Sequence, residues 1–225
     1  MYPQIRQVVF FFIVLLTALQ TNAQEKRERL LNKIFYEKQG GNFSLGVRNT
    51  VSLFNHGNWR EIGTGVGGHF RLQLADRVNT EWFADVLPAN IQNKASRMDY
   101  HVGWSVMFYL LNTKSFTRKL TPYVLAGHCF DITNIRINGE NGDHRSRFSS
   151  AVQAGLGCHY NITPRFDISL AAQYMIHLGK ELHAEENEAG EMEIELHKNA
   201  GWEGHLLLTL SVNYKIYKLW NRKAS

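Results

Sequence analysis

Apolar side chains occupy every second position over most of residues 151–179, and this alternation constrains the fold more than any other feature of the chain. Side chains of a β-strand point alternately to its two faces, so the pattern predicts two strands, each with one apolar and one polar or glycine-rich face. Pro164 lies in the break between them and predicts a tight turn. The apolar positions are Val152, Ala154, Leu156, Cys158, Tyr160, Ile162, Phe166, Ile168, Leu170, Ala172, Tyr174, Ile176 and Leu178.

Similar segments recur along the chain. We expect eight strands, at Asn42–Phe54, Arg60–Leu74, Asn79–Pro88, Met98–Leu111, Thr121–Ile137, Arg147–Ile162, Phe166–Gly179 and Trp202–Tyr217. Each has about the length that a tilted strand needs to cross a bilayer. The connections are mostly short at one predicted end of the strands and longer and more polar at the other, as with the periplasmic turns and external loops of outer-membrane barrels. Long connections are expected at 88–97, 137–146 and 180–201.

The first residues have the features of an export signal. Arg6 precedes a short apolar core, and small residues end at Ala23, so we expect a secretory signal peptide at 1–23. The alternative, a membrane anchor, is disfavoured because a spanning helix needs about 20 apolar residues. Residues 24–41 are expected to be a periplasmic leader, either a short amphipathic helix or disordered, followed by a barrel domain at 42–220 and a tail at 221–225.

Composition excludes some classes of function. The net charge of +5 is spread along the chain without a basic block, so the sequence does not indicate nucleic-acid binding. Cys129 and Cys158 lie on adjacent predicted strands but on opposite faces. Because disulfide geometry is strict, two free cysteines are favoured over a bridge. Nothing in the sequence indicates a cofactor or a metal centre.

Alternation alone does not say whether the apolar face lies inside or outside, since a soluble lipocalin-like barrel has its apolar face inside. Gly63, Gly65 and Gly67 share the polar face of their strand with His69 and Arg71. A glycine row facing water would weaken a strand without gain, whereas inside a narrow barrel it makes room for larger side chains. We therefore expect an all-β fold, an eight-stranded antiparallel up-and-down transmembrane β-barrel exported to the cell outer membrane.

The inward face is expected to hold a structural network of polar side chains: His69, Arg71, Glu81, Asp85, His101, His159, Asp167 and Gln173. Buried charges must be paired, so we expect these residues to plug the lumen rather than to gate a pore. On the outward face, aromatic side chains are expected to form the girdles at the membrane interfaces. The candidates are Trp82, Trp104, Tyr160, Phe166, Trp202, Tyr214 and Tyr217.

Three segments resemble strands of small outer-membrane β-barrel proteins of the OmpA/OmpX-like superfamily. They are Gly65–Gly68, Pro122–Gly127 and Ala154–Gly157. The resemblance covers about Asn42–Tyr217 and implies an eight-stranded barrel in the outer membrane. It brings no catalytic residue with it.

Several functions stay open. The first is a structural or surface-binding barrel, expected to be a monomer in outer-membrane lipid, whose loops contact surface polysaccharide or envelope proteins. A small diffusion pore would need an unusually empty lumen. A lipid-modifying enzyme would need serine, histidine and a carboxylate together on the lipid face. His128 faces outward, but we expect no well-placed serine and glutamate beside it.

The segment 181–197 is rich in glutamate and contains His183 and His197. Carboxylates and imidazoles can bind divalent cations, including those that bridge surface lipopolysaccharide. The segment has no fixed ligand spacing, however, so a solvated hairpin that projects beyond the membrane is expected instead.

Overall fold

The computed structural model describes residues 40–54, 62–111, 119–139, 142–163, 165–179, 181–187, 191–197 and 204–220. The predicted signal peptide, nearly all of the leader, Pro164, Trp202 and the predicted tail lie outside these residues. Within the described part of the chain, no helix is long and apolar enough to cross a membrane.

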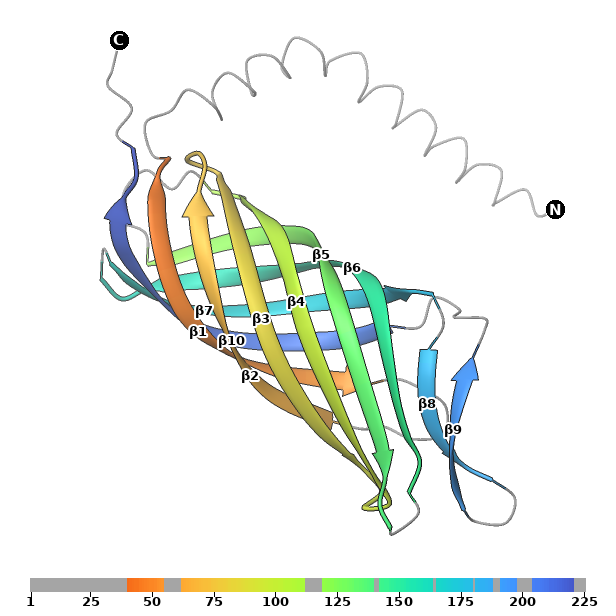
Figure 1. Ribbon diagram of the computed structural model, residues 1–225. Coiled ribbons are helices and arrows are strands. Elements are labelled where there is room, and N and C mark those ends of the chain that lie inside the picture. Colours follow the sequence, from red (N-terminus) through yellow and green to blue (C-terminus); the bar gives the residue numbers. More distant parts are fainter. Residues whose placement is uncertain are drawn as a thin grey trace, which may run out of the picture.

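Eight strands close into an antiparallel barrel in the order β1-β10-β7-β6-β5-β4-β3-β2, and two more form a separate hairpin (Figure 1). The barrel strands are β1 (Asn42–Phe54), β2 (Ile62–Gln73), β3 (Val78–Ile91), β4 (Ala95–Tyr109), β5 (Leu120–Ile137), β6 (His144–Asn161), β7 (Phe166–Leu178) and β10 (Gly204–Lys218). The hairpin consists of β8 (Glu181–Glu186) and β9 (Met192–His197). The predicted fold class and strand count of the barrel are confirmed.

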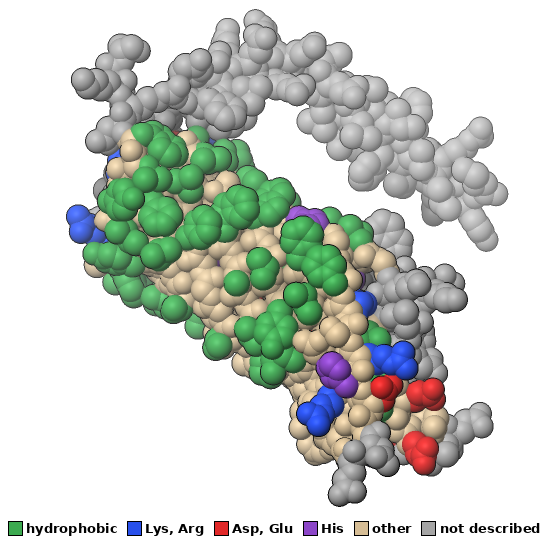
Figure 2. All heavy atoms as spheres, viewed as in Figure 1, with side chains coloured by type: hydrophobic (Ala, Val, Ile, Leu, Met, Phe, Trp, Pro, Cys, Tyr) green, Lys and Arg blue, Asp and Glu red, His purple; other side chains and the backbone are tan. Residues whose placement is uncertain are grey.

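The barrel has its apolar face outside. Val47, Val66, Leu156 and Leu170 are each 60–67% exposed, and large apolar side chains cover much of the wall (Figure 2). So much exposed apolar surface would be costly in water but matches the hydrocarbon core of a bilayer. The lipocalin-like alternative, with its apolar face inside, is therefore excluded.

Glycines on the inner face make room for large side chains, as the sequence predicts. A methyl group added to Gly157 would lie 2.5 Å from the Tyr123 ring, and one added to Gly103 would lie 2.7 Å from the Phe83 ring. Gly46 lies against the His69 ring in the same way. The glycines thus let a narrow barrel enclose aromatic and imidazole rings.

The two ends of the barrel differ. Both described termini lie at one end, where the amide of Gly41 donates to Gln73 O and that of Leu219 donates to Gly41 O. The turn at 74–77 and the turn at Thr163 are at this end. The opposite end carries the longer segments. From these lengths we assign the first end to the periplasm and the second to the cell exterior.

Two segments that were expected to be long loops instead form the outer ends of long strands. Residues 88–97 continue β3 and β4 as far as a tight turn at Gln92 and Asn93, whose φ angles are 50° and 59°. β5 and β6 likewise pair as far as Arg136 and His144. Outside the membrane both strand faces can be polar, so the alternation that marks a spanning strand is lost there.

The hairpin β8–β9 covers the inner face of these tall strands. Leu182, Ala184 and Ile194 from the hairpin are buried against a cluster on β3, β4 and β5. That cluster comprises Ile91, Ala95 and Ile135. At the rim, Lys94 Nζ lies 2.8 Å from Glu186 Oε1. The chain thus carries a β-sandwich at this end, formed by the outer ends of β3–β6 and by β8–β9. The expected hairpin is present, but it packs on the barrel strands and is not solvated on both faces, and its projection beyond the membrane stays a prediction.

We expect Ile194→Asp to detach the hairpin, because a carboxylate cannot be buried unpaired in the sandwich. Added protease should then cleave the segment 181–197 at the surface of intact cells several times faster, while the heat-modifiable gel mobility of the barrel is retained. Glu193→Gln, at the exposed neighbouring position, is the control and should leave cleavage unchanged. Equal cleavage of the native protein and Ile194→Asp would show that these apolar contacts do not hold the hairpin.

Candidate functional site

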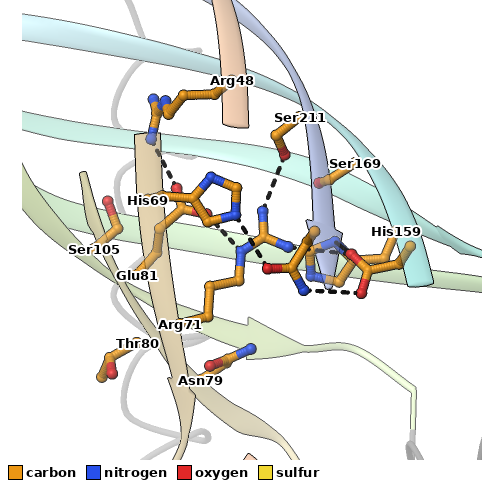
Figure 3. A network of polar contacts seen from close by, with 12 residues as sticks. Arg48, His69, Arg71, Asn79, Thr80, Glu81, Ser105, His159, Ser169 and Ser211 are labelled. Atoms are coloured by element: carbon orange, nitrogen blue, oxygen red, sulfur yellow. Dashed lines mark hydrogen bonds and ion pairs between the residues drawn. The ribbon is translucent and has the colours of Figure 1, made fainter. Parts of the chain in front are cut away.

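The lumen is filled by polar side chains whose centre is Arg71 on β2. Its Nε lies 2.6 Å from Glu81 Oε2, and its NH1 lies 3.2 Å from Asp167 Oδ1. Its NH2 also donates to Ser211 Oγ at 3.1 Å (Figure 3). Because β2, β3, β7 and β10 each supply one of these groups, a single guanidinium joins both sides of the barrel.

Arg48 on β1 extends the network toward the exterior. Its NH1 donates to Glu81 Oε1 at 2.9 Å, and its Nε lies 3.1 Å from Asp85 Oδ1. The guanidinium also stacks on the Phe83 ring, 4.2 Å from the ring centroid. The same side chain thus neutralises two carboxylates and packs against an aromatic face.

On the periplasmic side, rings and amides complete the filling. Asn79 donates to the Tyr109 hydroxyl at 2.8 Å, and that hydroxyl lies 3.3 Å from His159 Nε2. The ring centroids of Tyr123 and His159 are 4.5 Å apart. Asp167 contacts Lys215 Nζ at 3.3 Å in addition to Arg71.

On the exterior side, Asp131 is the common partner of three cationic or imidazole side chains. His101 Nε2, His177 Nδ1 and Arg147 NH2 each lie 3.4 Å from one of its carboxylate oxygens. Arg97 Nε lies 2.8 Å from Asp99 Oδ2 in the same region. Asp131 is fully buried, so these neighbours replace the water that its carboxylate would otherwise need.

The charges of the lumen balance. Among the described residues of the barrel strands, the inward cations that are buried or half-buried are Arg48, Arg71, Arg97, Arg147 and Lys215, and the buried inward carboxylates are Glu81, Asp85, Asp99, Asp131 and Asp167. A cavity of about 10 Å³ beside Arg71 and Tyr123 has room for about one water molecule. The described lumen is a packed polar core.

The structure brings together most of the residues that the sequence assigned to the lumen. All eight are buried. Arg71, Glu81 and Asp167 are in direct contact, Asp85 joins them through Arg48, and His159 lies 3.8 Å from Asp167. His69 contacts Asn213 at 3.2 Å, and Gln173 lines the small cavity. His101 belongs to the separate group around Asp131.

Sequence reasoning missed several members of the network, notably Arg48, Tyr109, Tyr123 and Asp131. Arg48 could have been found from the sequence, because polar or small residues alternate along β1 with residues that are apolar except for Asn49. The sequence signal for Tyr109 and Tyr123 is weaker, because an aromatic residue on the polar face of a barrel strand can be mistaken for part of the lipid face.

The six described girdle candidates lie on the outer wall toward the periplasmic end. Phe70, Trp82 and Trp104 form a row across β2, β3 and β4, with neighbouring ring centroids 6.0 and 6.3 Å apart. Tyr217 extends this row through Phe43. Tyr160 and Tyr214 are exposed, and Phe166 is half-buried, on the same part of the wall. Trp104 lies farther from this end than the tyrosines, since it is the register partner of His128, eight residues beyond Leu120, and the girdle stays a prediction.

The expectation for His128 was wrong in one respect. Ser150 on the neighbouring strand lies against it, with Ser150 Oγ 2.6 Å from His128 Nε2. The two residues are far apart in sequence and meet only through the register of β5 and β6. Both face the lipid side. Among the described residues, no carboxylate contacts this pair, so a serine–histidine–carboxylate triad is absent there.

The two cysteines are free. Cys129 is buried inside with Phe83, Ala151 and Met175, and Cys158 is half-buried on the outer face. In the acidic segment, Glu186, Glu191 and Glu193 are exposed, and the other acidic and histidine side chains lie outside the described set. Among the residues described, no group of three or more histidine, cysteine and acidic side chains is arranged to hold a metal ion.

No protein-family model matches the sequence, and a search of characterised proteins gives no match. Solved structures do match. Neisserial surface protein A is 12% identical with a TM-score of 0.50, over 80% of this chain and 99% of that one. The attachment invasion locus protein Ail of Yersinia pestis is 14% identical with a TM-score of 0.50, over 79% and 100%.

A major outer membrane protein of Thermus thermophilus is 8% identical with a TM-score of 0.53, over 77% of this chain and 99% of that one. At such identities the likeness concerns the fold. Together with the closed barrel and its apolar outer wall, it settles the architecture. The chain is a closed eight-stranded antiparallel β-barrel with an apolar outer wall, and it shares this fold with small outer-membrane barrel proteins.

Proposed function

We propose that this protein acts through its external surface, as a binding protein of the outer membrane, and not as a pore. The observation that carries the proposal is the contrast between the two parts of the barrel. Inside the membrane, paired charges and rings fill the lumen. Outside, four strands continue as a sheet and carry a second layer, β8–β9. A structure that only spanned the membrane would not need this sandwich.

The first test is electrical. Because the lumen is packed, the purified protein in planar bilayers should give a current no larger than that of the bare bilayer. The double variant Arg71→Ala, Arg48→Ala removes two side chains that fill the lumen, and it is the positive control. We expect it to give brief conductance steps. Sustained conductance of the native protein would overturn the plugged lumen and favour the pore.

The partner that the external sandwich fits best is an acidic polysaccharide. Arg136 and His144 are register partners at the external end of β5–β6, and both are exposed on the outward face. Lys94 and Arg145, in contrast, are already paired with Glu186 and Asp143. Figure 2 shows Lys and Arg side chains at this end, next to Asp and Glu side chains, with others at the opposite end and the apolar wall between them. The similar barrels include proteins named for the cell surface and for attachment.

Vesicles that display the protein should bind immobilised heparin, a sulfated polysaccharide, and not neutral dextran. Added salt should weaken binding, because dissolved ions screen the attraction between the basic side chains and the sulfate groups of heparin. Arg136→Ala should lower retention about threefold, since an exposed ion pair contributes about 0–1 kcal/mol. Lys94→Ala is the matched control. Equal binding to heparin and dextran would exclude this class of partner.

A further inference from the structure

The periplasmic end of the barrel carries basic side chains on all sides. Four junctions between neighbouring strands lie at this end: β2–β3, β4–β5, β6–β7 and the seam between β10 and β1. Each junction has a described basic residue at or close to the end of a strand, and these residues, the rim cations, are Arg77, Lys119, Arg165 and Lys218. Because the four junctions follow one another around the closed barrel, the rim cations surround its periplasmic mouth.

Among the described residues, no carboxylate forms an ion pair with a rim cation. Three of the rim cations are exposed and Arg77 is half-buried. The carboxylates closest to them in the chain, Asp76 and Asp167, are buried, and Asp167 pairs with Arg71 and Lys215. The exposed carboxylates of the described chain all lie at the other end of the barrel: Asp143, Glu186, Glu191 and Glu193. The positive charge of the rim is therefore open to an anion from outside the barrel.

Each rim cation has an exposed apolar side chain near it in the sequence. These apolar side chains are 45–59% exposed and lie within three residues of a rim cation: Leu74, Leu120, Ile162 and Leu219. In the view of Figure 2, Lys and Arg side chains border the apolar wall at this end, and Asp and Glu side chains are seen only at the other. The apolar wall thus continues as far as the rim cations and is followed there by positive charge.

This order of side chains matches the edge of a bilayer. The hydrocarbon core ends where the apolar wall of a barrel ends, and the phosphate groups of the lipids lie just outside it. A lysine or arginine at that level keeps its alkyl part beside the acyl chains while its charge reaches the phosphates. A lipid with a net negative headgroup gains more from this contact than a zwitterionic lipid, because no ammonium group offsets its phosphate.

The distribution of the rim cations favours separate lipid molecules over one acidic polymer. A linear polymer binds best to basic residues in a row, whereas these residues are spread over four junctions. A polymer of sugars would also leave the neighbouring leucine and isoleucine side chains in water. We propose that the rim cations bind anionic phospholipids of the periplasmic leaflet, with one headgroup phosphate at each junction and the acyl chains on the adjacent apolar wall. This surface is separate from the external one proposed above, at the opposite end of the barrel.

Spin-labelled lipids measure this preference in the full-length mature protein. The protein is reconstituted in phosphatidylcholine vesicles with a trace of phosphatidylglycerol or phosphatidylethanolamine that carries a nitroxide near the end of one acyl chain. Electron paramagnetic resonance separates the label held at the protein wall from the label in the free bilayer. We expect phosphatidylglycerol to associate about two- to threefold more strongly than phosphatidylethanolamine, because basic residues attract anionic headgroups. Added salt should reduce this preference.

Two triple variants locate the effect. The rim variant, Lys119→Gln with Arg165→Gln and Lys218→Gln, removes the exposed rim cations. It should bring the two lipids close to equal association while the heat-modifiable gel mobility of the barrel is retained. The control variant, Lys94→Gln with Arg136→Gln and Arg145→Gln, removes three exposed basic residues at the other end and should leave the preference intact.

Equal association of the two lipids with the native protein would overturn the proposal. A preference that survives in the rim variant, or that disappears in the control variant, would overturn it as well. If the two lipids associated equally and the native protein, but not the rim variant, sedimented with isolated peptidoglycan, the rim cations would bind a wall polymer instead of lipid.

Discussion

Replacing Arg71 with alanine should lower the free energy of unfolding by about 3–5 kcal/mol, which is the usual cost of breaking a buried ion pair by removing one partner. The loss is large because Glu81 and Asp167 both depend on this guanidinium, at 2.6 and 3.2 Å. Arg48 would still contact Glu81, but Asp167 would keep only Lys215, at 3.3 Å, and His159. Urea titration of the protein in lipid vesicles, followed by tryptophan fluorescence, measures the change.

Lys94→Ala is the matched control for this prediction. Its ion pair with Glu186 is 2.8 Å long, close to that of Arg71 with Glu81, but its side chains are 45% and 42% exposed rather than 3% and 10%. Exposed ion pairs contribute about 0–1 kcal/mol, so the unfolding midpoint should barely move. If Arg71→Ala were as mild as Lys94→Ala, the lumen would be hydrated and the plug would not hold the barrel together.

Arg71 also shows how far a sequence can specify this fold. Its place on the polar face follows from period-two alternation with Phe70 and Leu72, and the glycine rows decide that this face is the inside. The alternation along β5, β6, β7 and β10 identifies spanning strands in the same way. These local rules suffice for the fold, the sidedness and the burial of all eight predicted lumen residues.

Contacts across the barrel do not follow from the same rules. Arg71 meets Asp167 although 96 positions separate them, and Ser150 meets His128 on the next strand. Such pairs depend on strand register and on barrel closure, which a one-residue shift would alter completely. The tall ends of β3 and β4 were missed for a related reason, because a strand outside the bilayer has no lipid face to keep apolar.

Adjacent glycines on β2 should respond oppositely to alanine. Gly67 faces the lumen, where an added methyl would collide with Asp85 Oδ1 and the backbone oxygen of Ala84 and lie 2.8 Å from Asp85 Cα. The backbones of β2 and β3 cannot move apart within a closed sheet without breaking hydrogen bonds. Displacing the Asp85 side chain would disturb its contact with Arg48 at 3.1 Å. Gly67→Ala should therefore cost at least about 2 kcal/mol of unfolding free energy.

Gly68 faces lipid, and the nearest atom to an added methyl is Gly46 O at 3.7 Å, an ordinary contact. Neither glycine has a positive φ angle, so alanine introduces no backbone strain. Since glycine within a strand costs about 0.5–1 kcal/mol relative to alanine, Gly68→Ala should be neutral or stabilising. Urea titration of the two variants in the same vesicles compares them. If both variants were destabilised equally, glycine would be needed on this strand for its backbone conformation alone. If Gly67 makes room for the Arg48–Asp85 pair, only Gly67→Ala should lower the free energy of unfolding.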